Sequence, residues 1–280
     1  MAWQPKKDNG SGDKPGNVYE FKPKPKPRRP QGEWPVSASF LGLSCAFVLM
    51  AGIMLFTPQF ARGAVFPMIV AGWLISLCLH EFGHAYTAYK YGDSSVKDQG
   101  YLTLDPLKYT DPMNSILFPI LIVALGGIGL PGGSVFVKTH LFREPWQRAA
   151  MSAAGPFMNL VCLVVIMTIL NVFSGTMAAA PVLRASLAFL ALLQITSIVF
   201  NLLPVPGFDG WGVIEPWLPR GAREFGYQVA PYASLVVLML VFFAPPFREL
   251  IWGIVDMVAR PFGLNFRWSS EGYRMFQFWR

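Results

Sequence analysis

Long apolar runs separated by short polar stretches fill the chain after residue 35. A helix needs about 20 predominantly apolar residues to cross the hydrocarbon core of a bilayer. Five runs are candidates for such helices, at residues 36–57, 64–89, 149–173, 182–203 and 229–244. The pattern predicts an all-α polytopic membrane protein with five to six transmembrane helices.

Two further apolar segments do not fit a simple crossing. Residues 113–130, "MNSILFPILIVALGGIGL", are interrupted by Pro119 and by glycines at 126, 127 and 129, which favours a re-entrant segment. Residues 248–264, "RELIWGIVDMVARPFGL", carry four charges. They are consistent with an amphipathic interfacial helix or with a short last span, and both readings stay open.

Two short stretches have a strand-like character. They are "YLTL" at 101–104 and "SVFV" at 134–137, and the second follows a pair of glycines. We therefore expect a small membrane-associated β-sheet beside the helices.

Composition agrees with a membrane protein, because 53% of the residues are hydrophobic, only 14% are charged, and the mean hydropathy is +0.41. Residues 1–35 are rich in proline and carry eight Lys and Arg against four acidic residues. This composition predicts a disordered basic tail, with contact to anionic lipid headgroups as an alternative. The positive charge places the amino terminus in the cytoplasm of a multi-pass protein, for which a bacterial cell membrane is expected.

Three regions follow from this division of the chain. Residues 1–35 are the tail, residues 36–263 form the membrane domain, and residues 264–280 are a short carboxyl-terminal tail. The three cysteines are scattered among apolar segments and predict neither a disulfide framework nor a zinc knuckle.

The second apolar run ends in "HEFGH", residues 80–84, which holds two of the three histidines in the chain. On a helix, His80 and His84 lie on one face, so both can reach one zinc ion at about 2.0–2.1 Å. Glu81 follows the first histidine and is suited to act as the general base of an H-E-x-x-H site. The alternative is a helix end whose histidines only meet lipid headgroups, but Glu81 would then be an unexplained cost.

A catalytic zinc site needs a third protein ligand and leaves one position for water. The stretch "NLLPVPGFDG", residues 201–210, ends another apolar run and supplies Asp209. Its two prolines prevent a regular helix, so the backbone can turn the carboxylate inward. An ordinary Asp-Gly surface turn is the alternative reading. If Asp209 is not the ligand, His140 is the remaining candidate.

The combination of "HEFGH", "AAGPFMN" at 153–159 and "NLLPVPGFDG" resembles the site-2 proteases, a family of intramembrane zinc metalloproteases. The resemblance extends over about residues 36–258, and no PDZ-like domain is visible, as in a compact bacterial-type branch. It implies His80, His84 and Asp209 as ligands of one Zn2+ and Glu81 as the catalytic base. It also implies substrate-positioning roles for Asn159 and Asn201.

The reaction implied is hydrolysis of peptide bonds within or near transmembrane segments of other proteins. The expected partners are those substrates and the lipid bilayer, with a homo-oligomer left open and no nucleic acid expected. A catalytically inactive scaffold and a metal transporter are the rival functions. A scaffold should have lost a ligand or the base, and a transporter should carry polar residues along a through-path, whereas here they gather at one depth.

Overall fold

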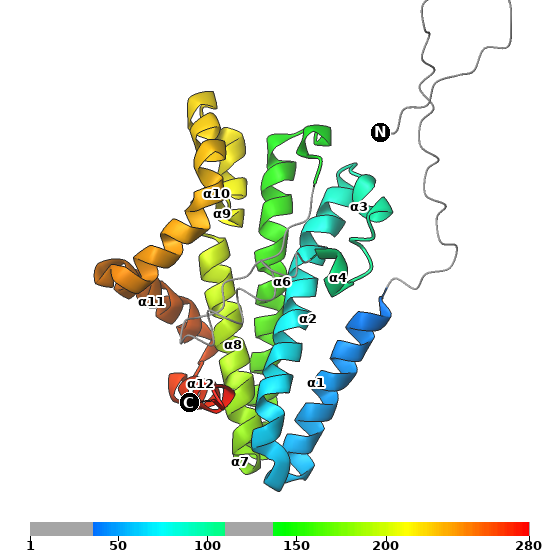
Figure 1. Ribbon diagram of the computed structural model, residues 1–280, viewed down its shortest axis with the longest axis vertical. Helices are drawn as coiled ribbons and strands as arrows, with labels where there is room; N and C mark the ends of the chain where they lie inside the picture. The colour runs from blue at the N-terminus through cyan, green and yellow to red at the C-terminus, as the bar shows by residue number, and fades with distance from the viewer. Residues whose placement is uncertain (1–35, 110–136, 280) are drawn as a thin grey trace, which may run out of the picture. The chain divides into compact units, whose positions relative to one another are not determined.

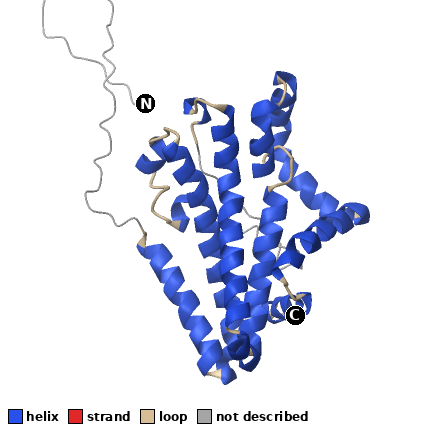
Figure 2. Ribbon diagram, turned by 180° about the vertical axis from the view of Figure 1, so that it is seen from behind, coloured by secondary structure: helices blue, strands red, loops and turns tan. Residues whose placement is uncertain are grey.

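The computed structural model describes residues 36–109 and 137–279, and every regular element in these ranges is a helix (Figure 2). The helices are α1 (Ala38–Phe56), α2 (Ala61–Lys90), α3 (Ser95–Asp98), α4 (Pro106–Tyr109), α6 (Pro145–Val172), α7 (Ser174–Ala179), α8 (Pro181–Asn201), α9 (Asp209–Ile214), α10 (Arg220–Phe243), α11 (Pro245–Ala259) and α12 (Phe266–Phe276). Short 3₁₀ turns occur at Pro58–Phe60, Thr139–Leu141, Glu215–Trp217 and Arg260–Phe262.

The five predicted transmembrane helices are present as α1, α2, α6, α8 and α10. Within the described ranges these five are long and apolar enough to cross a membrane. The prediction of an all-α polytopic membrane fold is therefore confirmed. Helix α11 has 15 residues and would extend about 22 Å, short of the roughly 30 Å hydrocarbon core.

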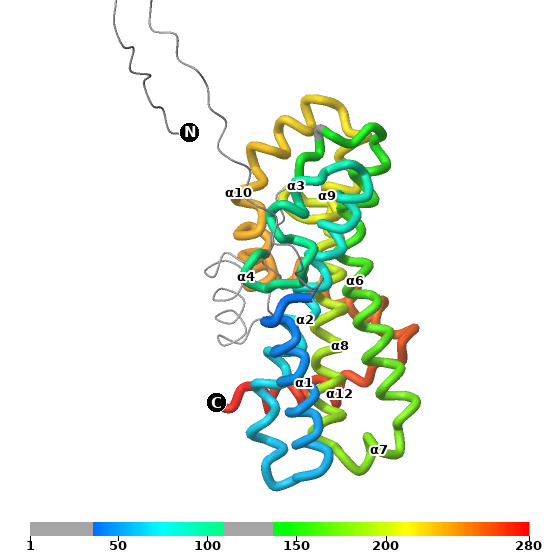
Figure 3. The backbone as a smooth tube through the Cα atoms, turned by 90° about the vertical axis from the view of Figure 1, so that its right-hand side faces the viewer, coloured from blue at the N-terminus to red at the C-terminus, as the bar shows by residue number. Residues whose placement is uncertain are grey.

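Helices α2, α6 and α8 pack side by side and form the centre of the fold (Figures 1 and 3). Helix α8 is the most buried of the five spans, and α1, which lies along α2, is the least buried. Small residues such as Ala188 and Ala191 on α8 are fully buried and allow its neighbours to approach closely. Larger side chains, including Met68, Leu163 and Leu190, fill the space between the three helices.

The strand predicted at 101–104 is wrong. These residues form a turn in which the amide of Tyr101 donates to the carbonyl of Val96 and the amide of Thr103 donates to that of Gly100. Gly100 (φ +79°) and Leu104 (φ +55°) are both left-handed, which interrupts an extended chain. No strand occurs anywhere in 36–109 or 137–279, so the predicted β-sheet is not supported there. Of the second predicted strand only Val137 is described, and the re-entrant segment 113–130 lies outside the described residues.

The end of α2 and the approach to α6 are joined by Asp93. Its buried carboxylate accepts hydrogen bonds from the Ser95 amide (3.0 Å), the Ser95 hydroxyl (2.5 Å) and the Lys138 amide (2.7 Å). Burial alone would raise the pKa of Asp93, but these hydrogen bonds outweigh it and hold the pKa below its ordinary value. The chain therefore leaves α2 and enters α6 on the same side of the bundle (Figure 1).

The carboxyl-terminal residues 264–280, set apart above as a tail, include the amphipathic helix α12. It packs against α8, where Gly272 lies so close that an added Cβ would come 2.2 Å from the carbonyl oxygen of Ala185. The Ser269 hydroxyl donates to the carbonyl of Ala188 (3.0 Å), and the Arg184 guanidinium lies over the Trp268 ring. These contacts attach α12 to the central helices.

Candidate metal centre

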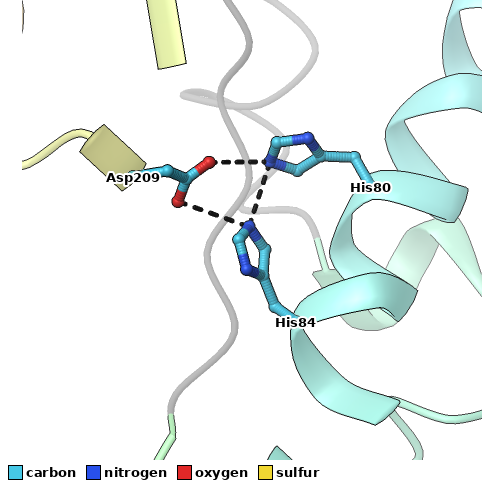
Figure 4. Close-up of side chains that lie close together, drawn as sticks. All are labelled: His80, His84 and Asp209. Carbon is cyan, nitrogen blue, oxygen red and sulfur yellow. Dashed lines mark hydrogen bonds and ion pairs between the residues drawn. The ribbon is translucent and has the colours of Figure 1, made fainter. Parts of the chain in front are cut away.

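His80, His84 and Asp209 point toward one another (Figure 4). The two Nε2 atoms are 3.1 Å apart. Asp209 Oδ2 lies 3.3 Å from Nε2 of His80, and Asp209 Oδ1 lies 3.3 Å from Nε2 of His84. The structure therefore brings together, from α2 and α9, the three side chains that the sequence singled out as metal ligands.

Asp209 reaches this position because the chain turns sharply after α8. Pro204 and Pro206 keep the connection out of a helix, and α9 then begins at Asp209 itself. The following Gly210 lies against the end of α8, where an added Cβ would come 2.2 Å from the carbonyl oxygen of Leu202. Only glycine permits this approach, so the Asp-Gly pair directs the carboxylate toward α2.

The partners of the two imidazoles orient them toward a shared point. His84 Nδ1 lies 2.8 Å from the backbone carbonyl of Met151, which can only accept, so Nδ1 of His84 carries a proton. The lone pair of neutral His84 is consequently on Nε2, facing His80 and Asp209. His80 Nδ1 lies 2.6 Å from Oδ1 of Asn159 on α6, so the Nε2 of His80 also faces the centre. A histidine that binds a metal commonly has such a partner on its other nitrogen.

Two observations test whether the residues fit a metal. Asp209 Oδ2 is buried and makes no hydrogen bond within the described part of the chain, although it lies beside His80 Nε2. Gly155 on α6 faces the same point, and an added Cβ there would come 2.2 Å from His84 Nε2 and 2.7 Å from His80 Nε2. The site thus combines an uncompensated oxygen with a glycine whose missing side chain lets both imidazoles come close to α6. Two imidazoles and a carboxylate are a zinc-type ligand set, and the residues fit.

Charge in the site is arranged for a cation. Asp209 binds a metal as the carboxylate, and the neutral imidazoles of His80 and His84 each turn an Nε2 atom toward its oxygens. Glu81 is only 3% exposed and follows His80 on α2, yet it does not belong to the converging group of ligand atoms.

A second cluster, which the sequence did not indicate, holds α9 in place. The Arg148 guanidinium on α6 donates to the Glu215 carboxylate (2.9 Å) and to the Thr139 hydroxyl (2.7 Å). The hydroxyl of Tyr227 on α10 also donates to Glu215, which is buried just after α9. Glu215 is thereby tied to α6 and α10, six residues from Asp209.

The two asparagines assigned by resemblance lie in different settings. Asn159 is buried and contacts His80, and its amide group donates to Gln194 Oε1 on α8 (2.8 Å). Asn201 lies at the end of α8, where its amide donates to the Ser197 hydroxyl one turn back (3.4 Å). Gln194 was not predicted, although a polar residue inside an apolar run is a signal that could have identified it.

The H-E-x-x-H helix, the third carboxylate and the membrane-spanning bundle together define a membrane-embedded zinc metalloprotease. The chain belongs to peptidase family M50, the site-2 protease family, whose model matches residues 68–181 and so includes His80, Glu81, His84 and Asn159. The zinc cofactor and the enzyme class follow from this membership.

The curated relatives carry the similarity beyond the family model. The chain is 41% identical to the zinc metalloprotease Rip2 of Mycobacterium tuberculosis H37Rv, over 88% of this chain and 93% of the relative. It is 42% identical to the Rip2 protein of Mycolicibacterium smegmatis, over 77% of this chain and 82% of the relative. It is 32% identical to the zinc metalloprotease YwhC of Bacillus subtilis, over 69% of this chain and 88% of the relative. No solved structure matches the chain.

Proposed function

We propose that this protein hydrolyses peptide bonds within or near transmembrane segments of other membrane proteins. In this proposal His80, His84 and Asp209 hold one zinc ion and Glu81 is the catalytic base. The observation that carries the proposal is the place of the ligand set. The two histidines lie on α2, which is long and apolar enough to span a membrane, and they meet Asp209 of α9 beside Gly155 of α6.

Zinc, when bound, polarises a peptide carbonyl and lowers the pKa of its water to about 7. Glu81 then accepts the proton of the attacking water and delivers it to the departing amine, as the general base of an H-E-x-x-H site does. The Nε2 atoms of His80 and His84 and the Asp209 carboxylate fix where that reaction occurs. Asn159 and Asn201 are retained as substrate-positioning candidates, and Asn159 additionally contacts His80.

A transmembrane substrate must be locally unwound, because a helix hides each carbonyl in a hydrogen bond to a backbone amide. We propose an orientation in which the amino terminus, Asp93 after the end of α2 and Lys138 before the start of α6 face the cytoplasm. The basic residues Lys138, Arg143 and Arg148 on this side support it, as does the basic stretch 1–35. The mycobacterial and Bacillus relatives support a bacterial cell membrane.

The test is to separate the base from the ligands. Glu81→Gln should retain about one zinc per chain and lose cleavage, because the amide cannot accept the proton. Asp209→Ala should lose zinc affinity together with cleavage. Zinc content would be measured in purified, detergent-solubilised protein. Substrates would be identified by comparing the membrane proteins that accumulate in cells expressing each variant. A Glu81→Gln protein that still cleaves, or an Asp209→Ala protein with full zinc and turnover, would refute these roles.

A further inference from the structure

A continuous chain of hydrogen bonds runs behind His80 through the centre of the bundle. The Ser76 hydroxyl donates to the carbonyl of Trp73 (2.8 Å), and Gln194 Nε2 donates to the Ser76 oxygen (3.0 Å). Asn159 Nδ2 donates to Gln194 Oε1 (2.8 Å), and His80 Nδ1 lies 2.6 Å from Asn159 Oδ1. These hydrogen bonds lead from Ser76 on α2 to Gln194 on α8 and Asn159 on α6. They end at His80 on α2, one helical turn after Ser76.

All the side chains in this chain of bonds are shielded from solvent. Gln194 is 1% exposed, Asn159 3% and Ser76 4%. A buried polar group that loses its partner costs about 1–3 kcal/mol, so each amide must find both a donor and an acceptor among these neighbours. No member can reverse its orientation alone.

We propose that Gln194 is a positioning residue for the metal centre, which acts through Asn159 to fix the tautomer and orientation of His80. The direction of the whole chain follows from its far end. The carbonyl of Trp73 can only accept, so Ser76 donates to it and presents its oxygen lone pair to Gln194. Gln194 consequently turns its amide group toward Ser76 and its oxygen toward Asn159.

The same reasoning carries the orientation to the histidine. Asn159 uses its amide group on Gln194 and therefore presents its oxygen to His80. His80 must then carry its proton on Nδ1, which leaves the lone pair of Nε2 facing His84 and Asp209. If the chain of bonds ran in the opposite direction, the proton of neutral His80 would lie on Nε2, in the place where the metal must bind.

His84 provides a built-in comparison, because its Nδ1 faces the carbonyl of Met151, which cannot reverse. The two ligands are thus held in the same tautomer by different means. His84 uses a backbone oxygen of α6, whereas His80 uses two side-chain amides whose orientation depends on α8. Removal of Gln194 should therefore affect His80 and leave His84 unchanged.

The inference rests on the proposed function in taking His80 as a zinc ligand, but its first readout needs neither zinc nor activity. The variant Gln194→Met keeps much of the side-chain length and removes both polar atoms. Gln194→Glu is the conservative rescue, since a carboxyl oxygen can still accept from Asn159. Thr196→Val is the matched control, because Thr196 is equally buried on α8 and, among the described residues, its hydroxyl bonds within its own helix, to the carbonyl of Leu193.

The first measurement is the ¹⁵N spectrum of histidine-labelled, metal-free protein at a pH at which the imidazoles are neutral. The chain has three histidines, and a His140→Ala background leaves only the two ligand candidates. Wild type, Gln194→Glu and Thr196→Val should each show two rings protonated on Nδ1. Gln194→Met should show one ring of mixed tautomer beside one unchanged ring.

The second measurement is the zinc dissociation constant by competition with a chelator. Loss of a partner that orients a metal ligand typically weakens binding about 10- to 100-fold, and this loss is expected for Gln194→Met. Gln194→Glu and Thr196→Val should bind zinc like wild type. If Gln194→Met does not fold, Ser76→Ala removes the anchor of the chain of bonds and should also produce a mixed His80 tautomer.

Three results would overturn the proposal. The first is a folded Gln194→Met with wild-type tautomers and wild-type zinc affinity. The second is an equal loss of zinc affinity in Gln194→Met and Gln194→Glu. The third applies if Ser76→Ala replaces Gln194→Met, and is a single His80 tautomer in Ser76→Ala. A wild-type protein that binds no zinc would instead refute the proposed function. Mixed tautomers in metal-free Gln194→Met would still support the role of Gln194 in that case.

Discussion

At the scale of single residues, the metal centre depends on the absence of a side chain at Gly155. Its position on α6 faces the two ligand nitrogens, which lie so close that only a glycine fits there. A methyl group at this point would occupy the region in which the imidazoles converge. The histidines could move away from it only by giving up the orientation that their Nδ1 hydrogen bonds impose.

We expect Gly155→Ala to weaken zinc binding roughly 10- to 100-fold. Overpacking costs about 1–3 kcal/mol, and here the added methyl group would destabilise the zinc-bound protein. The control is Gly63→Ala, since Gly63 lies on α2 with no atom within 4 Å of an added Cβ. That change should leave zinc binding unchanged, and helix propensity favours alanine there. Chelator competition on both proteins checks the prediction, which wild-type zinc affinity in Gly155→Ala would contradict.

The chemistry of the site could be predicted at this scale only where the sequence carries a local pattern. His80 and His84 are four residues apart, so their shared face follows from helix geometry. Asp209 was found because an acid beside two prolines is unusual at the end of an apolar run. Gly155 and Gln194 come from other helices, and their places beside His80 and behind it depend on packing that no local spacing encodes.

At the scale of elements, the short helix α9 must be held against the bundle, because it carries Asp209 and has only six residues. The buried Glu215 anchors its far end through Arg148 and Tyr227. This connection joins α9 to α6 and α10. An element of this length has little stability of its own, so such tertiary contacts determine its position.

Glu215→Gln should leave Arg148 without its counter-charge and destabilise the protein by about 3 kcal/mol. This is the lower end of the range for a broken buried ion pair, and it applies because Arg148 is partly exposed. Zinc affinity should fall with it as α9 loosens. The matched control is Glu224→Gln, whose pair with Arg220 is more than half exposed and is worth at most about 0.5 kcal/mol. Thermal unfolding in detergent with and without zinc measures both effects, and equal stability of the two variants would contradict the prediction.

The elements themselves were predictable to different degrees. The transmembrane helices follow from hydropathy, because an apolar run of this length has few alternatives in a bilayer. The strand at 101–104 was predicted from four residues, and such a short pattern is decided by its flanks. There the left-handed Gly100 and Leu104 form a turn. Helix α12 is amphipathic and polar on one side, so hydropathy alone did not reveal that it packs on α8.

At the scale of the whole molecule, the metal centre requires its ligands to lie at one depth in the membrane. Helix α2 ends, and α6 begins, at the end of the bundle opposite to α7 (Figure 1). The hydrogen bond from Lys138 to Asp93 brings the two ends of the intervening chain together. The described residues on either side of that stretch therefore lie at the same end of the bundle.

Single cysteines would test this topology in a background without Cys45, Cys78 and Cys162. Asp98→Cys and Lys138→Cys lie at exposed positions on the proposed cytoplasmic side, and Ala178→Cys lies in α7 on the other side. A membrane-impermeant thiol reagent should label the α7 position in intact cells, and the other two only after the cytoplasm is opened. Labelling of Lys138→Cys from outside would be incompatible with the proposed orientation.

The central claim is that His80, His84 and Asp209 bind one zinc ion, and X-ray absorption at the zinc edge tests it most directly. For the purified full-length protein the claim predicts two imidazole nitrogens at about 2.0–2.1 Å and protein and water oxygens at about 2.0–2.2 Å. In Asp209→Ala, loaded at a zinc concentration that overcomes its weaker binding, the carboxylate contribution should be lost. A sulfur ligand at about 2.3 Å, a third imidazole, or an unchanged spectrum in Asp209→Ala would contradict the claim.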